Sequence, residues 1–474
     1  MSSPTGAIPA PPERARRPHR GEQLELVVEG IAHGGAGVAR LERYVLFVEG
    51  AFPGERVRAE VTRSKRDYAH ARTVEVLDPS PDRVPVRCDH EGGECPGSPW
   101  QTLRYERQLE HKEELVGDAL RRIGGLEGFE LEPIVAASDP WRYRNKTEYS
   151  FGPSEEAPPQ LRLGFHARGR WDRVNDARDC LLASERNNAV RNFVRDWCTT
   201  QGLDPLDRRT QTGYLRNLVV REGRRTGDLQ IRLVTSPGEF DVDGLGDALG
   251  ERFPEASFLW TRTSASAEVT DDGTTEVVSG EDTLTERLGD LEFKISPDAF
   301  FQPNTETAES LYALACDYAD LRGTERVYDL FCGIGTLSLT LAMRAGEVWG
   351  VELVEEAVAD AIRNAQLNEI DNTHFFHGDV RDSVRPLAER APRPDVVVVD
   401  PPRAGLSKKV VRRLIETRPR RIVYVSCNPT TLAPNAAQMA EAGYHLARVR
   451  PVDMFPHTPH IECVALLERT EGDG

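Results

Sequence analysis

The chain has 474 residues and a formal net charge of −17, from 77 Asp and Glu against 60 Lys and Arg. This length exceeds one ordinary hydrophobic core, so two or three domains are expected. No run of about 18 apolar residues occurs, which argues against a membrane span. The eight cysteines are scattered. We therefore expect a reducing, cytoplasmic location in which they serve as core residues, metal ligands or a nucleophile.

Arginine is concentrated in short segments, although the chain as a whole is acidic. The acidic balance disfavours RNA at first sight, because phosphate contacts need Lys and Arg. Basic clusters nevertheless occur at residues 63–72, 142–146, 162–178 and 208–225. Net charge alone therefore leaves the partner undecided.

The first 80 residues contain two segments of different character. Residues 1–20 are rich in Pro and Arg and have no apolar core, which is typical of a disordered arm and not of a secretory signal. Residues 21–80 alternate short β-rich runs with Gly- and Pro-containing turns. The runs start at Leu24, Tyr44, Arg56 and Arg72. This spacing predicts a small barrel of the OB type, a fold that often binds oligonucleotides; a purely structural barrel is the alternative.

Residues 81–292 show mixed strand and helix patterns, which predict a central α+β domain without a nucleotide-binding motif. Leucine and isoleucine recur at helical spacing between residues 100 and 126, and Gly124 and Gly125 end the pattern. We therefore predict a helix over 100–126.

Residues 293–474 are predicted to form an α/β domain. Between residues 305 and 468, β-rich runs alternate with helix-like segments. Strands separated by helices indicate a doubly wound parallel sheet.

A glycine-containing loop at residues 329–336 follows one of these strands and opens a helix. Gly333 and Gly335 let the backbone approach a ligand at the helix N-terminus. Glu352 ends the next β-run, where a carboxylate can accept hydrogen bonds from ribose hydroxyls. The loop has no third glycine at the dinucleotide spacing, which favours S-adenosylmethionine over a dinucleotide. Asp379 is expected near the adenine, with a helix N-cap as the alternative.

The sequence Asp-Pro-Pro-Arg, residues 400–403, follows four consecutive valines. The prolines stop the strand and stiffen a loop beside the ligand. Similar Pro-Pro loops occur in amino-group methyltransferases, where an aromatic residue usually follows. Arg403 stands there instead, which weakens that interpretation.

Cys427 directly follows the β-rich run 421–425, at the edge where an open α/β sheet presents residues to its ligand. A thiolate there can add to C6 of a pyrimidine and make C5 nucleophilic. Glu462, 35 residues later, is the candidate base for the C5 proton. The alternatives are a buried apolar cysteine and a solvated carboxylate. Cys332, inside the cofactor loop, is interpreted as a packing residue.

Taken together, these motifs resemble the RNA (uracil-5-)-methyltransferase family, and most closely its ribosomal RNA branch with an N-terminal TRAM barrel. The resemblance covers nearly the whole chain. It implies a Rossmann-like S-adenosylmethionine methyltransferase domain over residues 293–474, on which helix 100–126 can pack. The implied roles are Cys427 as nucleophile, Glu462 as base, and Gln302, Phe331, Glu352 and Asp400 around the cofactor. Many members have Asn where this chain has Thr336, so that contact departs from the pattern.

The resemblance also implies a four-iron, four-sulfur (4Fe–4S) cluster, which many members hold with four cysteines. Cys88, Cys95 and Cys180 match three of the positions, and Ser98 stands where another cysteine is usual. Thiolates are the usual ligands of such clusters. The sequence therefore leaves open a cluster with three thiolates or a vestigial site.

We expect an S-adenosylmethionine-dependent uracil-C5 methyltransferase that acts on RNA, with 23S ribosomal RNA as the first expectation and transfer RNA as the second. An RNA cytosine-C5 methyltransferase and a non-catalytic RNA-binding assembly factor are the rival hypotheses. The expected protein is a monomer without a membrane partner.

Overall fold

The computed structural model describes residues 16–88, 95–154, 161–268, 270, 272–391 and 393–470. The chain divides into two compact units. The first comprises residues 1–85 and 102–107, and the second comprises residues 86–101 and 108–474. Most of the expected disordered arm, residues 1–15, lies outside the described residues.

The first unit contains a closed barrel of five strands in the order β1-β2-β3-β5-β4. The strands are β1 (Gln23–Ile31), β2 (Gly37–Leu41), β3 (Tyr44–Glu49), β4 (Arg56–Ser64) and β5 (Tyr68–Asp78). Alternate side chains, such as Leu26 and Val28, fill its core. The predicted barrel is confirmed, but β2 lies where no strand was predicted. Gly37 opens it, and a side chain there would lie 2.7 Å from the Ala51 carbonyl oxygen.

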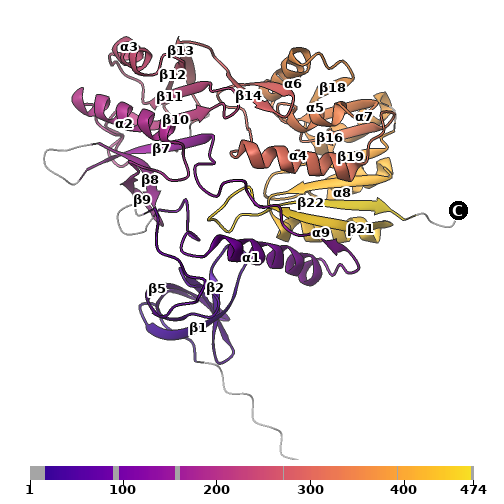
Figure 1. The fold of residues 1–474 in the computed structure, drawn as a ribbon, viewed down its shortest axis with the longest axis horizontal. Coiled ribbons are helices and arrows are strands. Elements are labelled where there is room, and N and C mark those ends of the chain that lie inside the picture. Colours follow the sequence, from indigo (N-terminus) through magenta and orange to yellow (C-terminus); the bar gives the residue numbers. More distant parts are fainter. Residues whose placement is uncertain are drawn as a thin grey trace, which may run out of the picture. The chain divides into compact units, whose positions relative to one another are not determined.

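The central part of the second unit is a seven-stranded sheet in the order β13-β12-β11-β10-β7-β8-β9. Its strands are β7 (Lys146–Pro153), β8 (Leu161–Ala167), β9 (Arg170–Asp176), β10 (Leu215–Glu222), β11 (Leu229–Thr235), β12 (Ala256–Arg262) and β13 (Thr274–Ser279). Helices α2 (Glu185–Thr200) and α3 (Val242–Arg252) share one apolar core with β10 and β11, so both cover the same face (Figure 1). The hairpin β14 (Leu284–Leu288) and β15 (Leu291–Ile295) follows.

An eight-stranded sheet in the order β18-β17-β16-β19-β20-β22-β21-β6 forms the rest of the unit. The strands are β6 (Glu130–Leu131), β16 (Arg326–Leu330), β17 (Glu347–Glu352), β18 (Thr373–His377), β19 (Val396–Val399), β20 (Arg421–Ser426), β21 (Tyr444–Val452) and β22 (Glu462–Arg469). From β18 to β20 all neighbours are parallel, and β22 then pairs antiparallel with both β20 and β21. The predicted α/β class is confirmed.

Helices cover both faces of this sheet (Figure 1). They are α4 (Thr305–Ala319), α5 (Thr336–Ala342), α6 (Glu355–Leu367), α7 (Val380–Arg390), α8 (Lys408–Thr417) and α9 (Pro429–Glu441). Side chains alternate along a strand, so Val396 and Val398 pack in the core with α4, α5 and α6. Val397 and Val399 pack on the other face with α7, α8 and α9.

The helix predicted over residues 100–126 begins later than expected. It consists of α1 (Tyr105–Asp118) followed by one π-helical turn, η1 (Ala119–Ile123). Val116 and Leu120 lie in the same core as Leu432 and Ala433 of α9. In the described part of the chain, no helix is long and apolar enough to cross a membrane.

Candidate active site

The predicted site residues follow neighbouring strands of the eight-stranded sheet at their carboxyl ends. In register, Leu330 pairs with both Val351 and Val399, and Val399 pairs with Tyr424. The chain order reverses between β16 and β19, and α/β sheets bind ligands in the crevice outside such a reversal. The loops that continue from these four strands therefore meet at one edge.

The loop after β16 has an unusual backbone. Phe331, Gly333 and Gly335 have φ angles of 76°, 53° and 87°. A non-glycine residue at such an angle is strained, and strained residues cluster at ligand sites. Nothing lies within 4 Å of the position that a Gly333 side chain would occupy. The loop thus leaves open space where the sequence predicts a cofactor.

Glu352 fixes this loop. Its Oε2 accepts a hydrogen bond from the Gly333 N–H at 3.0 Å, and its Oε1 accepts from the Leu353 and Val354 N–H groups at 2.7 and 2.9 Å. A carboxylate offers about four lone-pair sites, so Glu352 keeps capacity for a ligand hydroxyl. Leu353 is 61% exposed, which leaves apolar surface beside the carboxylate.

Two further predicted cofactor residues already have protein partners. Thr336 donates from its hydroxyl to the Tyr312 hydroxyl oxygen at 3.2 Å. Asp379 caps helix α7, because its Oδ1 accepts from the Arg381 N–H at 2.8 Å. The N-cap alternative for Asp379 is therefore present, and its contact with adenine stays a prediction.

Asp329, the first residue of the glycine-containing motif 329–336, is a further residue of the site. It is fully buried, and its Oδ2 accepts from the Ser338 hydroxyl at 2.6 Å. Its Oδ1 has no hydrogen-bond partner in the described structure. Burial raises the pKa of Asp329 to about 7, and burial together with Asp329 raises the pKa of Asp400 to about 7. A charged residue inside the apolar run 327–330 was the available signal.

This set of residues fits the predicted cofactor. S-Adenosylmethionine carries an ammonium group, a sulfonium group and ribose hydroxyls. An unpartnered buried carboxylate oxygen, as in Asp329, suits a cation, and Glu352 suits hydroxyls. Gln302 is buried, and its carbonyl oxygen accepts from Asn145 Nδ2 at 2.8 Å. The structure therefore holds Gln302 through its backbone.

Cys427 and Glu462 are brought together by strand pairing. Ser426 at the end of β20 pairs in antiparallel register with Cys463 of β22. Cys427 directly follows this last pair of β20, and Glu462 directly precedes Cys463 and pairs with Val452 of β21. The side chains interact electrostatically, and burial, then Glu462 and Asp400, raise the pKa of the Cys427 thiol to about 11.

Glu462 is not a solvated carboxylate. It is 3% exposed, and its Oε2 has no hydrogen-bond partner among the described residues. Burial, followed by the nearby Asp400, raises its pKa well above the usual range, whereas Arg403 lowers it. Arg403 also lowers the pKa of Cys427. Arg403 is thus the cation beside both groups, a role that the sequence pattern did not reveal.

The loop that leads to Glu462 is held by helix α1. His457 has a φ of 63°. Its N–H donates to Gln108 Oε1 at 2.9 Å, and its ring stacks on Trp141 with centroids 3.9 Å apart. Burial lowers the pKa of His457 to about 4, so the ring is neutral at neutral pH. The ring contact with Trp141 and the hydrogen bond to Gln108 thus attach this loop to the rest of the unit.

The three candidate metal-binding cysteines are near one another, since Cys180 and Cys95 each raise the pKa of the Cys88 thiol after burial. Ser98 is buried, and its hydroxyl oxygen accepts from Gln101 Nε2 at 3.3 Å. Within the described residues, no three or more His, Cys, Asp and Glu side chains are arranged to hold a metal ion. The donor set therefore does not fit a cluster held by four thiolates. Residues 89–94, between Cys88 and Cys95, lie outside the described part.

Cys332 packs as predicted. It is buried, and its Sγ lies 2.9 Å from where a side chain at Gly350 would begin. Burial raises its pKa far above the usual range.

The parallel sheet with a ligand crevice at its strand reversal agrees with the methyltransferase class of enzymes, and comparisons with known proteins identify the family. A family model described as tRNA (Uracil-5-)-methyltransferase matches residues 274–470, and a TRAM domain model matches residues 18–74. An uncharacterized RNA methyltransferase of Chlorobaculum tepidum is 40% identical over 439 residues, which is 88% of this chain and 90% of the relative. Another, from Halalkalibacterium halodurans, is 37% identical over 452 residues, which is 95% of this chain and 98% of the relative.

Among solved structures, the chain is similar to the tRNA (uracil-54, C5)-methyltransferase of Pyrococcus abyssi in complex with S-adenosyl-L-homocysteine. The TM-score is 0.76 at 28% sequence identity, over 94% of this chain and 100% of that chain. The chain belongs to the tRNA (uracil-5-)-methyltransferase family and is an RNA methyltransferase with an N-terminal TRAM domain. The family expected from the sequence motifs is confirmed.

Proposed function

We propose that this enzyme methylates C5 of a uridine in RNA through a covalent bond between Cys427 Sγ and C6 of the base. The observations that support the proposal are the β20–β22 pairing, which ends at Ser426 and Cys463, and the electrostatic effect of the buried Glu462 on the Cys427 thiol. Uracil C5 is a weak nucleophile until a thiolate adds at C6. A nucleophile and a base within reach of one ring provide both halves of this chemistry.

The residues act in a defined order. Cys427 adds to C6 as the thiolate, and the electron pair of the C5–C6 bond moves toward C5 and O4. S-Adenosylmethionine, when bound, supplies an electrophilic methyl group. C5, made nucleophilic by Cys427, would take that methyl group, and the donor would leave as its thioether. Glu462 then takes the C5 proton, the C5–C6 double bond re-forms, and the Cys427–C6 bond breaks to release a thiolate.

The environment of Cys427 and Glu462 supports these roles. Arg403 favours the charged forms of both side chains, whereas burial opposes them. Closure of the site over a base would remove water and strengthen the attraction of Arg403 for the thiolate. The unpartnered Oε2 of Glu462 leaves an acceptor for the proton.

The donor would be held at the reversal of strand order. Glu352 would accept from ribose hydroxyls, and Asp329 with Asp400 would face the positively charged part of the molecule. Gly333 and Phe331 form the loop beside it, and Gln302 lies on the segment before α4. The support for this arrangement is the unpartnered Asp329 Oδ1 and the open space at Gly333.

The proposed RNA is 23S ribosomal RNA, because the motifs resemble the TRAM-containing ribosomal branch. Transfer RNA is the second candidate, since the similar Pyrococcus abyssi structure is a tRNA (uracil-54, C5)-methyltransferase. Mapping of 5-methyluridine in both RNAs from a deletion strain and its parent tests the choice. Loss of one 5-methyluridine from 23S RNA alone is the expected result. Loss from transfer RNA alone would favour the second candidate, and loss of 5-methylcytidine would contradict uracil chemistry.

A further inference from the structure

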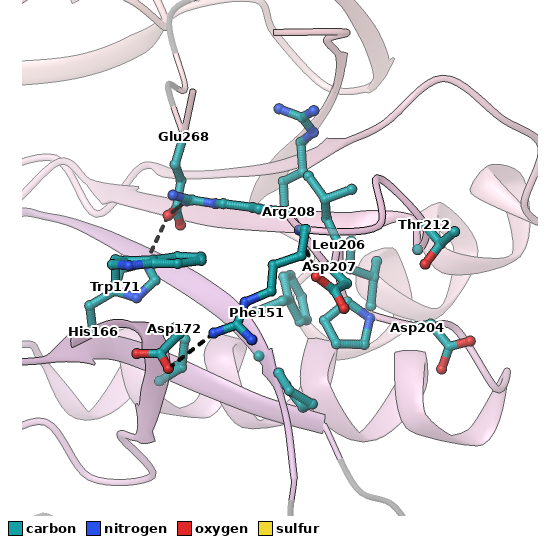
Figure 2. Close-up of a pocket in the computed structure, with 18 of the residues that line it drawn as sticks. Phe151, His166, Trp171, Asp172, Asp204, Leu206, Asp207, Arg208, Thr212 and Glu268 are labelled. Carbon is teal, nitrogen blue, oxygen red and sulfur yellow. Dashed lines mark hydrogen bonds and ion pairs between the residues drawn. The ribbon is translucent and has the colours of Figure 1, made fainter. Parts of the chain in front are cut away.

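The central sheet contains a pocket of about 570 Å³ that is separate from the predicted catalytic residues. All the residues that line it lie between Phe151 and Glu268, so none belongs to the eight-stranded sheet or its loops (Figure 2). They come from β7, β8 and β9, from the segment 204–216, and from residues 267–268. Its volume falls in the range of about 300–1,000 Å³ that ligand sites take.

One wall of the pocket is an exposed tryptophan at the edge of the sheet. Trp171 on β9 is 54% exposed, which is unusual for the largest apolar side chain. The guanidinium of Arg209 lies 5.6 Å from its ring centroid, and Arg209 Nη2 lies 3.8 Å from Asp172 Oδ2. Figure 2 shows Trp171 and Asp172 among the side chains that line the pocket. Phe151 and Pro205 add apolar surface to the lining.

The polar groups of the pocket are held in place by the protein. Glu268 accepts from His166 Nε2 at 2.7 Å and from Asn217 Nδ2 at 3.0 Å, and it also pairs with Arg208. Arg216 Nη2 donates to the Ala265 carbonyl oxygen at 2.7 Å. Side chains fixed in this way need little reordering when a ligand binds.

The segment 204–213 is shaped to form its side of the pocket. Asp207 Oδ1 accepts from the Arg209 N–H at 2.7 Å, which sets the turn that carries Arg209. Gly213 has a φ of 98°, and a side chain there would lie 2.1 Å from the Pro205 carbonyl oxygen. Only glycine fits at that position, so this turn depends on Gly213.

We propose that this pocket binds one unstacked nucleotide of the RNA substrate, with its base on Trp171 and its phosphate facing Arg209. The proposal rests on the proposed function, because it takes RNA to be the substrate. Single-stranded RNA is bound by aromatic side chains on which bases stack and by basic groups that follow the backbone. Trp171 and Arg209 provide this pair, and Glu268 with Asp207 provides acceptors for base N–H groups. A nucleotide held here would anchor the RNA at a second point, away from the methylated base.

The test is equilibrium binding of a fluorescein-labelled single-stranded RNA of about 12 nucleotides, followed by anisotropy without a methyl donor. Trp171→Ala should weaken binding about tenfold, because loss of base stacking costs this order of affinity. Trp171→Phe should restore most of the loss. The matched control is Val277→Ala, since Val277 is 42% exposed on β13, the opposite edge of the same sheet; its affinity should equal that of the wild type.

A second variant tests the phosphate contact. Arg209→Gln should weaken binding and make the log–log dependence on salt shallower by about 0.7, the value for one phosphate contact to a single strand. An RNA with 4-thiouridine should crosslink to peptides around Trp171 on irradiation. Unchanged thermal stability of each variant establishes that the fold is intact.

The outcomes separate this inference from the proposed function. Wild-type affinity in Trp171→Ala, or no RNA binding by the wild-type protein, would overturn the pocket assignment. If the pocket assignment fails but the wild-type protein methylates uridine, the proposed function is still supported. Conversely, weakened binding in Trp171→Ala by a protein that never methylates uridine would support the pocket and refute the proposed function. If free mononucleotides bind to the pocket but Trp171→Ala leaves the RNA affinity unchanged, the pocket is a small-molecule site. That result would overturn the assignment.

Discussion

Lys112 of helix α1 and Asp453, just after β21, form an ion pair in which both side chains are fully buried. Lys112 Nζ also donates to the Phe455 carbonyl oxygen at 3.0 Å. These contacts join residues more than 300 positions apart and hold the start of the loop that ends at Glu462. Together with the bonds of Gln108 to His457, they make α1 the support of the proposed base.

The first prediction concerns this support. Lys112→Met should lower the free energy of unfolding by about 3–5 kcal/mol, because it leaves a buried carboxylate without its cation. The double variant Lys112→Met with Asp453→Leu should recover much of the lost free energy of unfolding, because the buried carboxylate is then removed as well. Urea unfolding measures both. The exposed pair of Arg344 with Asp317 provides the control, because Arg344→Gln should cost at most about 1 kcal/mol.

A loss in Lys112→Met no larger than in Arg344→Gln would contradict the role of the buried pair. If α1 supports the proposed base Glu462 and not only the stability of the fold, Lys112→Met should also change the kinetic constants. Under conditions where Lys112→Met is folded, kcat should fall while KM for RNA stays near the wild-type value. This pattern indicates an interaction needed in the transition state alone.

The second prediction concerns the nucleophile. RNA with 5-fluorouridine at the target should form a complex with the enzyme that survives denaturation, because fluorine cannot leave C5 as a proton does. Cys427→Ala should form no such complex and show no turnover, as gel mobility and methyl incorporation would report. Cys316→Ala, a buried cysteine on α4, is the control and should retain both. An adduct in Cys427→Ala would place the nucleophile elsewhere.

The third prediction concerns the base. Glu462→Gln keeps the size of the side chain but cannot accept the C5 proton. Turnover should fall about 10²–10⁴-fold, the usual contribution of general-base catalysis. Methyl transfer in a single turnover should persist, so covalent RNA–protein product should accumulate on denaturing gels. Turnover at the wild-type rate would refute the assignment of Glu462.

The fourth prediction concerns pH. The pKa of the Cys427 thiol is raised to about 11, mainly by burial, so its thiolate is scarce at neutral pH. The rate of adduct formation with 5-fluorouridine RNA should therefore rise about tenfold per pH unit from pH 7 to 9. Arg403→Gln should slow the reaction at pH 8, because Arg403 lowers the pKa of the thiol.

The difference between wild type and Arg403→Gln should narrow as the pH approaches the pKa of the thiol. Arg412→Gln, an exposed charge change on α8, should leave the profile unchanged. A rate independent of pH between 7 and 9 would mean that Cys427 is already a thiolate in the enzyme–RNA complex.

The fifth prediction concerns iron. With Ser98 in place of a cysteine, we expect protein purified without oxygen to hold less than a full 4Fe–4S cluster. Ser98→Cys should raise the iron and sulfide content, because it adds a fourth thiolate beside Cys88, Cys95 and Cys180. Elemental analysis and the visible absorption spectrum measure this. Full iron content in the wild type, lost in Cys180→Ala, would show that three thiolates suffice.

Much of the fold follows from local sequence. Alternating β-rich runs with Gly and Pro turns predicted the barrel, because side-chain periodicity and turn chemistry act within a few residues. Four valines before Pro401 predicted the buried strand β19. Helix α1 was placed too early, because Leu103 fits helical spacing although the helix begins at Tyr105. Strand β2 was missed, because its five residues follow a glycine-rich turn.

The sequence by itself also determined the chemical types at the site, since each candidate stands at the end of a strand in a recognisable motif. The positions of these residues relative to one another, and their burial, were decided by the tertiary structure. The antiparallel pairing of β20 with β22 brings Ser426, which precedes Cys427, against Cys463, which follows Glu462. Burial raises the pKa of Glu462 and leaves its Oε2 without a hydrogen-bond partner among the described residues.

Long-range packing decided the remaining features. Lys112 and Asp453 meet only because α1 lies against the loop after β21, and no local pattern records such a pair. Trp171 and Arg209 form one wall of a pocket because the segment around residue 207 turns back over β9. Burial, desolvation and charge pairing depend on which segments, distant in the sequence, are in contact in the fold. Motifs alone do not specify those contacts.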